Sequence, residues 1–302
     1  MGNAKRLPSH LSEAPFSTRR ARAEGVAARR LRARDVAHPF HGVNATMVPA
    51  SLIERCEAYV ERMLDGQVFS HATAAALYGM PLSADTTPGP LHVSVARPRT
   101  PPRARGVVGH SLADPDIREV AGMPACSPAQ VWLQLAATLE REELVAVGDH
   151  ILGSRNRPAL ASLRDLRDAV RTRNAPGVRA LRWAVERVRC GADSRPESLL
   201  RLAVVEAGLP EPSINPPIML PEGLVIHPDL VFFPQRTILE YEGDGHRTDS
   251  GQWMRDIRRH DLTADAGWRV MRVTRVDLFA ARPEFVGRLR RTLHARRVTA
   301  PP

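Results

Sequence analysis

The sequence predicts an α/β chain, α+β overall, in which a C-terminal core of order αβββαβα follows a mostly helical, winged-helix-like N-terminal region. Two observations predict the core. Two apolar, β-prone runs flank Pro234-Gln235, as in a hairpin. Helical patterns surround these runs and a further β-prone run near the C-terminus. Shifts in composition divide the chain into three expected domains, residues 1–45, 46–189 and 190–302.

The composition indicates a globular protein of two or three domains. The chain has 302 residues, of which 43% are hydrophobic. No apolar run approaches the ~20 residues of a membrane span, and the N-terminus lacks the apolar core of a signal peptide. We therefore expect a cytoplasmic protein without membrane association. Three widely spaced cysteines predict neither a disulfide framework nor a zinc cluster; they are Cys56, Cys126 and Cys190.

The formal charge of +10 is concentrated at the two ends of the chain. Residues 1–45 contain nine Lys or Arg against three Asp or Glu, and residues 252–302 contain twelve Arg against five acids. Basic ends on either side of an acidic site suit a polyanionic partner such as DNA. The alternative is that the positive charge reflects a compositional bias toward arginine, because Lys5 is the only lysine and arginine supplies nearly all the positive charge.

The first 45 residues predict a loose basic arm followed by a helix-turn-helix. Residues 1–15 are polar, and helical patterns then cover Ser17 to Glu24 and Ala27 to Asp35, with Gly25 between them. The second of these helices would present basic side chains to DNA. The candidates are Arg29, Arg30 and Arg32. Any small basic helical hairpin has the same pattern, which leaves a structural alternative open.

The next segment alternates helices with two expected strands. Residues 51–64 are amphipathic, and a helix over residues 70–79 has Ser70 as its expected N-cap. Residues 91–95 alternate like a strand, and residues 106–110 suit a returning strand. We expect His71 to pack against a neighbouring element.

Helical patterns fill the chain as far as the expected boundary near residue 190, and residues 153–192 among them are rich in arginine. Ser127-Pro128 opens the first of these helices. Residues 142–152 continue helically and contain Asp149-His150, which we interpret as a hydrogen-bonded pair on the helix surface.

The C-terminal domain opens with a capping-box pattern, Ser194 to Glu197, at the start of a helix. The remaining elements follow from apolar alternation and from glycine and proline breaks. The expected strands are residues 214–220, 224–233, 237–242 and 268–274, and the expected helices are residues 252–266 and 283–295.

The hairpin carries the main functional signal. A turn over Phe233–Arg236, or over Pro234-Gln235 alone, sets Asp229 opposite Glu240, and Glu242 then points to the same face. Three carboxylates among apolar residues raise one another's pKa and oppose folding. A divalent cation such as Mg²⁺ resolves that conflict, since carboxylates are among its usual ligands. The structural alternative is a hairpin edge whose acids face water.

The C-terminal segment resembles the restriction-endonuclease-like, or PD-(D/E)xK, nucleases, and among them most closely the branch related to the very-short-patch mismatch-repair endonuclease. The matching residues lie in the first helix, the hairpin and the following helix and strand. They are Glu197, Pro228-Asp229, Glu240-Tyr241-Glu242-Gly243, His246, Trp253, Asp256-Ile257-Arg258-Arg259 and Gly267-Trp268-Arg269-Val270. The N-terminal part resembles AbiEi-type antitoxins at residues 69–75 and 91–95. The whole chain is similar to an uncharacterised bacterial family with both parts.

The resemblance implies hydrolysis of DNA phosphodiester bonds that depends on Mg²⁺ or Mn²⁺. Asp229 and Glu240 would hold the metal, and Glu197 would reach the site from the helix. The alternative for Glu197 is its capping-box role alone. Arg255, Arg258 and Arg259 would contact phosphates, or would form a solvated basic face. Many related nucleases work as homodimers, which cut both strands.

One departure from the pattern divides the functional hypotheses. The lysine expected two residues after the second acid is Glu242 here, which would serve as a third metal ligand or as a general base. His246 would orient water or act as an acid, or would be a plain loop residue. Two functions follow, a metal-dependent DNA endonuclease and a non-catalytic, antitoxin-like DNA-binding regulator on a degenerate nuclease fold.

Overall fold

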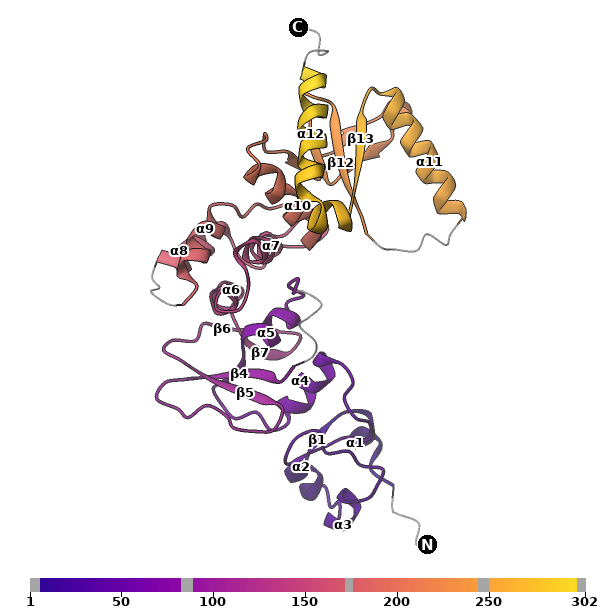
Figure 1. Ribbon diagram of the computed structural model, residues 1–302. Coiled ribbons are helices and arrows are strands. Elements are labelled where there is room, and N and C mark those ends of the chain that lie inside the picture. Colours follow the sequence, from indigo (N-terminus) through magenta and orange to yellow (C-terminus); the bar gives the residue numbers. More distant parts are fainter. Residues whose placement is uncertain (1–5, 83–88, 172–175, 244–249, 298–302) are drawn as a thin grey trace. The chain divides into compact units, whose positions relative to one another are not determined.

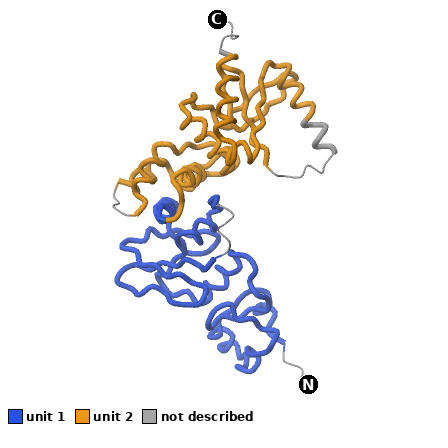
Figure 2. The backbone as a smooth tube through the Cα atoms, viewed as in Figure 1, with its two compact units in different colours: residues 1–137 blue, residues 138–302 orange. Residues whose placement is uncertain are grey.

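The computed structural model describes residues 6–82, 89–171, 176–243 and 250–297 (Figure 1). The chain divides into two compact units, residues 1–137 and residues 138–302 (Figure 2). No helix within the described residues combines the length and the apolar character needed to cross a membrane.

The N-terminal part of the first unit is a small helical cluster closed by a two-stranded sheet. Its elements are α1 (Ser9–Glu13), β1 (Phe16–Ser17), α2 (Thr18–Ala23), α3 (Ala28–Leu31) and β2 (Val43–Asn44). β1 and β2 pair antiparallel, with Phe16 opposite Asn44. Leu11 packs fully buried with Phe16, Ala21 and Leu31. The expectation of a loose arm over residues 1–15 is therefore wrong for residues 9–13, because Leu11 anchors a helix in this core.

A five-stranded mixed sheet follows, in the order β5-β4-β3-β7-β6. Its strands are β3 (Gln67–Phe69), β4 (Leu91–Ala96), β5 (Val107–Leu112), β6 (Ile117–Val120) and β7 (Met123–Cys126), and its helices are α4 (Leu52–Val60), α5 (His71–Leu77) and α6 (Pro128–Leu135). The sequence analysis expected two of these strands. The other three have three or four residues each, too few for a clear alternation. β5 runs parallel to β4, so it is not the returning strand that we expected.

The second unit begins before the expected boundary near residue 190. Its first helices are α7 (Arg141–Leu152), α8 (Leu163–Arg171), α9 (Val178–Val185) and α10 (Arg195–Glu206). α7 belongs with the C-terminal core because its Ala146 packs among Leu199, Leu200 and Ala203 of α10. The carboxylate of Asp149 in α7 also accepts a hydrogen bond from Arg201 at 3.0 Å. Asp149 is fully buried, which corrects its assignment to the helix surface.

The C-terminal core contains a four-stranded sheet in the order β13-β12-β11-β8. Its elements are β8 (Ser213–Ile214), β11 (Leu230–Phe232), β12 (Thr237–Glu242), α11 (Ser250–Asp265), β13 (Arg269–Thr274) and α12 (Arg282–Arg297). With α10 in front, the helices and the strands of this sheet run in the order αβββαβα, while each of the expected strands over residues 214–220 and 224–233 is divided between this sheet and a second, two-stranded sheet. A small hairpin of β9 (Ile218–Met219) and β10 (Val225–Ile226) and a π-helical turn, Val276–Ala280, are additions to it.

Helices cover both faces of this sheet (Figure 1). On one face, Leu230, Leu239 and Met271 pack with apolar residues of α10 and α12. On the other face, Val231 and Ile238 pack with Leu262 of α11 and with Trp268. β12 and β13 pair in parallel, and α11 forms the crossover that such a pair requires. The two faces fix where every side chain of β11 and β12 points.

Candidate functional site

The hairpin of β11 and β12 has the predicted register. Leu230 pairs with Leu239, and Phe232 pairs with Thr237. The turn covers residues 233–236, closed by a hydrogen bond of 3.0 Å from the Arg236 N–H to the Phe233 carbonyl. Asp229, just before β11, therefore lies beside Glu240. The carbonyl of Asp229 also accepts from the Asn215 N–H at 2.9 Å, which extends the pairing of β8 with β11.

The two predicted acids of β12 lie on the face of the sheet that α11 covers. Val231 and Ile238 point to that face, and side chains two residues apart along a strand share a face. Glu240 and Glu242 share the face of Ile238 in β12, and Asp229 directly precedes β11. The carboxylate of Asp229 bonds the Tyr241 N–H of β12, so the prediction that all three acids share one face stays a prediction for Asp229.

Asp229 is the half-buried centre of the site. Its Oδ2 accepts a hydrogen bond of 2.7 Å from the Tyr241 N–H. Burial, followed by the negative charges of Glu197 and Glu240, raises the pKa of Asp229 to about 7, although the Tyr241 N–H and the guanidinium of Arg259 act in the opposite direction. The charged form of this carboxylate is therefore poorly compensated by the protein alone.

Glu197 lies in the first turn of α10 and acts on Asp229 through its charge. Its Oε2 accepts from the Asp193 N–H at 2.9 Å and from Asn215 Nδ2 at 3.0 Å. Its Oε1 accepts from Ser194 Oγ at 2.8 Å. Ser194 caps α10 by accepting the Glu197 N–H, whereas the buried carboxylate of Glu197 bonds the Asp193 N–H instead of the Ser194 backbone that the capping box predicted, and its charge raises the pKa of Asp229.

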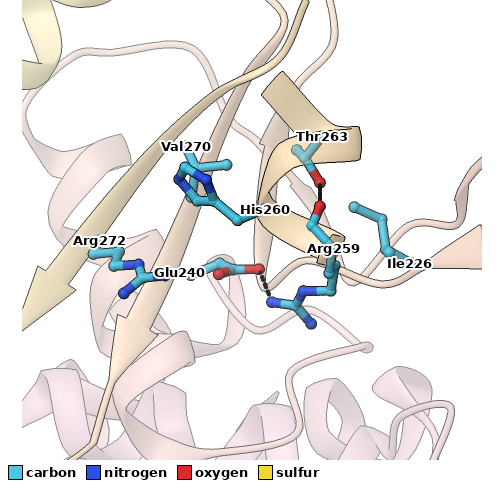
Figure 3. A pocket seen from close by; sticks show the side chains of 7 residues that line it. All are labelled: Ile226, Glu240, Arg259, His260, Thr263, Val270 and Arg272. Carbon is cyan, nitrogen blue, oxygen red and sulfur yellow. Dashed lines mark hydrogen bonds and ion pairs between the residues drawn. The ribbon is translucent and has the colours of Figure 1, made fainter. Parts of the chain in front are cut away.

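Two arginines hold the glutamates of β12. Arg259 Nη2 of α11 lies 2.7 Å from Glu240 Oε1, and Figure 3 shows the carboxylate directed at this guanidinium. Arg272 of β13 is the cross-strand partner of Glu240, and its Nε lies 3.4 Å from Glu242 Oε1. The helix α11 and the strand β13 thus each place one guanidinium group next to the acids.

A cavity of about 30 Å³ opens beside Glu240 (Figure 3). Charged and polar groups make up more than half of its lining. The lining residues are Ile226, Glu240, Arg259, His260, Thr263, Val270 and Arg272. A cavity of this volume can hold about one small ion or one water molecule.

The three predicted acids, all within the described residues, do not form a tight cluster. Within the described residues, the one set of three or more His, Cys, Asp or Glu whose ligand atoms lie within 4.8 Å of one another is a histidine group in the first unit. The close convergence of Asp229, Glu240 and Glu242 that the hairpin suggested is therefore not found. The ion pairs with Arg259 and Arg272 are the physical reason, because they draw Glu240 and Glu242 toward the guanidinium groups.

The remaining predicted residues divide into three groups. His246 and the side chain of Arg255 lie outside the described part of the chain. Arg258 and Arg259 are exposed on α11, where Arg258 pairs with Glu222 and Arg259 with Glu240. In the first unit, Arg29 and Arg32 are exposed.

Arg30 is held by an ion pair. Its guanidinium bonds to both carboxylate oxygens of Asp35, at 2.9 and 2.7 Å.

Arg272 belongs to the site although it was not among the residues predicted from the sequence. Met271 and Val273 point into the core with α10 and α12, so Arg272 between them points to the face of the acids. The alternation was visible in the sequence. The parallel pairing that sets Arg272 opposite Glu240 was not.

Two proteins of Mycobacterium tuberculosis, both named as uncharacterised, are similar to this chain. They come from strain CDC 1551 / Oshkosh and strain ATCC 25618 / H37Rv, and each is 26% identical over 264 residues, which cover 86% of this chain and 93% of the relative. An alignment of this length is longer than either compact unit, so it includes parts of both. No family model and no solved structure matches the chain.

Proposed function

We propose that the second unit is a metal-dependent endonuclease that hydrolyses phosphodiester bonds in DNA. The observation that carries this proposal is the half-buried Asp229, whose pKa is raised by burial and by the negative charges of Glu197 from α10 and Glu240 from the hairpin. The element order αβββαβα around a mixed sheet supports a restriction-endonuclease-like core. The basic ends of the chain support a polyanionic substrate.

The residues fit a hard divalent cation. Carboxylate oxygens are the ligands that Mg²⁺ and Mn²⁺ prefer, and Asp229 and Glu240 would hold such an ion. The repulsion that Asp229 experiences from its two acidic neighbours is the repulsion that a cation relieves. The ion pair with Arg259 engages one oxygen of Glu240, and a carboxylate has a second. A bound divalent ion would polarise the scissile phosphate and lower the pKa of water.

The protein's own groups would bind and orient the substrate. Arg272 and Arg259 would neutralise phosphate charge, and they supply the positive charge that the missing lysine would otherwise give. Glu242 beside Arg272 would be a third oxygen ligand or the general base for the attacking water. Glu197, fixed by three hydrogen bonds, would hold Asp229 in place through Asn215 and the backbone around it.

Cleavage assays test this function. Supercoiled plasmid and mismatched, branched and single-stranded oligonucleotides would be incubated with Mg²⁺, with Mn²⁺ or with EDTA. We expect cleavage that requires the divalent ion and that falls at least about 100-fold in Glu240→Gln, since several kcal/mol of transition-state stabilisation depend on the metal. Glu284→Gln, an exposed glutamate on α12, is the matched control and should cleave normally.

A non-catalytic DNA-binding regulator is the second candidate function. The observation in its favour is that Glu240 and Glu242 each pair with an arginine. The N-terminal order α1-β1-α2-α3-β2 supports a winged-helix-like DNA-binding module for either function. Retained DNA binding without cleavage of any of these substrates would favour the regulator and would count against the nuclease.

The N-terminal module gives a separate prediction. Arg29→Gln and Arg32→Gln are each expected to weaken DNA binding evenly across sequences and to lower the slope of log affinity against log salt by about 0.9, because each removes one phosphate contact. Titrations by fluorescence anisotropy at several salt concentrations measure this slope. Arg171→Gln, an exposed arginine on α8, should leave it unchanged. Equal slopes for all three variants would exclude Arg29 and Arg32 from the DNA contact.

A further inference from the structure

We propose that the first unit binds one divalent transition-metal ion, best matched by Zn²⁺, through His71, His92 and His110. These histidines lie in the five-stranded sheet region and have no part in the proposed nuclease site. The inference therefore stands independently of the proposed function.

The three histidines come from three different elements that pack together. His71 is the first residue of α5, His92 lies in β4, and His110 lies in β5. β4 and β5 pair in parallel, with Ser94 opposite His110. His92 and His110 are thus diagonal neighbours on one face of the sheet. α5 packs on β4, and Thr73 Oγ1 of α5 accepts from the His92 N–H at 2.8 Å.

The imidazole nitrogens are already close to ligand geometry. One nitrogen from each ring lies within 4.8 Å of the others. His92 Nδ1 and His110 Nε2 are 2.9 Å apart. The rings of His71 and His110 stack at 3.8 Å between centroids. Zn–N bonds of about 2.0–2.1 Å in a tetrahedral site put the nitrogens about 3.3 Å apart, so small ring rotations are sufficient.

The protein keeps the three rings in the protonation state that a metal needs. Burial, together with the neighbouring histidines, lowers the pKa of His71 to about 3. Burial also lowers the pKa of His92, and burial with the charge of His92 lowers that of His110. A lowered pKa favours the neutral ring, and neutral imidazole is the form that binds metal.

Hydrogen bonds orient His71 as they do in established metal sites. Its Nδ1 lies 3.0 Å from Ser70 Oγ, which accepts a second hydrogen bond of 2.7 Å from Ser94 Oγ. Both serines are fully buried. A histidine that binds metal through one nitrogen commonly donates the other N–H to a fixed acceptor, so Ser70 leaves Nε2 of His71 for the ion. Ser70 is the N-cap residue of α5, as expected, but its side chain makes no capping hydrogen bond because its hydroxyl is engaged by His71 and Ser94.

The backbone at His71 provides an independent indication. His71 has φ of 50°, a left-handed conformation that residues other than glycine rarely adopt. The Gln134 side chain stabilises it by accepting the His71 N–H at 2.8 Å. Strain that a protein maintains in this way is typical of functional positions. Three histidine ligands would leave a fourth tetrahedral position for water or a small anion.

Metal binding to the full-length protein tests the site. After removal of metals, equilibrium dialysis against Zn²⁺ should give one ion per chain, and Co²⁺ should give the visible absorption of a tetrahedral site. His92→Ala and His110→Ala should each reduce the affinity roughly 100-fold or more, while Ser70→Ala, which removes only the orienting group, should reduce it about 10- to 100-fold. His38→Ala and His294→Ala, at exposed histidines, are the matched controls.

Two further measurements keep the test decisive. Asp229→Asn should retain the bound Zn²⁺, which separates this cluster from the carboxylates of the second unit. In the wild type, nitrogen NMR of the imidazoles should show three histidines shifting together when Zn²⁺ is added, a readout that does not require the variants to fold. Zn²⁺ binding that survives in folded His92→Ala and His110→Ala, or a titration that shifts none of the three rings, would overturn the proposal.

Discussion

Replacing Asp229 with asparagine is expected to stabilise the protein above pH 7 and, under the proposed function, to reduce DNA cleavage about 1000-fold or more, because a metal ligand is lost. Asparagine keeps an oxygen that can accept the Tyr241 N–H. It removes the charge that burial, Glu197 and Glu240 disfavour. Stability and activity should therefore change in opposite directions at a single residue.

The gain in stability should depend on pH in a defined way. The pKa of Asp229 is about 7 in the folded protein, raised from its ordinary value of 3.8. Between these values the folded state binds a proton that the unfolded state has released, so the free energy of unfolding falls as the pH rises. The wild type loses up to about 4 kcal/mol across this window, and the asparagine variant avoids most of that loss.

Urea denaturation in EDTA at pH 4 and pH 8 measures the difference. Asp229→Asn should match the wild type at pH 4 and exceed it at pH 8. Saturating Mg²⁺ at pH 8 should then stabilise the wild type by about 2.7 kcal/mol at 100 times its dissociation constant and leave the variant unchanged. Asp261→Asn, at an exposed aspartate on α11, is the control. A variant less stable than the wild type at pH 8 would show that the charge of Asp229 is already compensated.

The hairpin was predictable because its determinants are local. A turn with an even number of residues and the alternation of apolar side chains fix both the register and the face of the acids in β12. Asp229 and Glu240 could be paired from the sequence for this reason. The N-cap at Ser194 could be found in the same way, since its hydroxyl accepts the N–H of Glu197, three residues further along one helix.

The partners of the glutamates were not predictable because they depend on packing. Arg259 reaches Glu240 from α11, and Arg272 reaches Glu242 from β13, after a crossover that only the folded sheet defines. The sequence shows which charged residues lie near an acid along the chain, but it does not show which of them forms an ion pair with that acid in the fold. The expected cluster of carboxylates was too tight for this reason.

The same limit applies to the first unit. His71, His92 and His110 are separated along the chain, and only the parallel pairing of β4 with β5 and the packing of α5 bring them together. The strand that contains His110 was expected to be a returning strand, antiparallel to β4. Its parallel direction is what places His110 diagonally beside His92.

Replacing Arg201 with methionine is expected to destabilise the second unit by about 3–5 kcal/mol, because it leaves Asp149 charged and buried without its partner. Arg201 is 1% exposed and Asp149 is fully buried. Asp149 Oδ2 accepts from Arg201 at 3.0 Å, and Oδ1 accepts from the Arg189 N–H at 2.7 Å. The Arg201 side chain also donates to the Arg187 carbonyl at 2.8 Å, so it joins three segments.

Urea denaturation, together with amide hydrogen exchange in α7 and α10, measures this loss. Burial already raises the pKa of Asp149, and loss of the guanidinium should raise that pKa further. The variant can then neutralise Asp149 by protonation, so its deficit should be larger at pH 8 than at pH 5. Arg164 is 89% exposed and pairs with Asp168, so Arg164→Met should cost less than about 1 kcal/mol.

The double variant Asp149→Leu with Arg201→Met separates two explanations of the pair. In the first explanation, the two charges do little more than offset each other's cost of burial. Apolar residues of similar size should then restore stability to about the wild-type level or above it. Arg201 Nε is buried without a hydrogen-bond partner among the described residues, which is a cost that the double variant removes. A double variant as unstable as Arg201→Met would instead assign the stability to the hydrogen bonds that tie α7 and α10 to the backbone of residues 187–189.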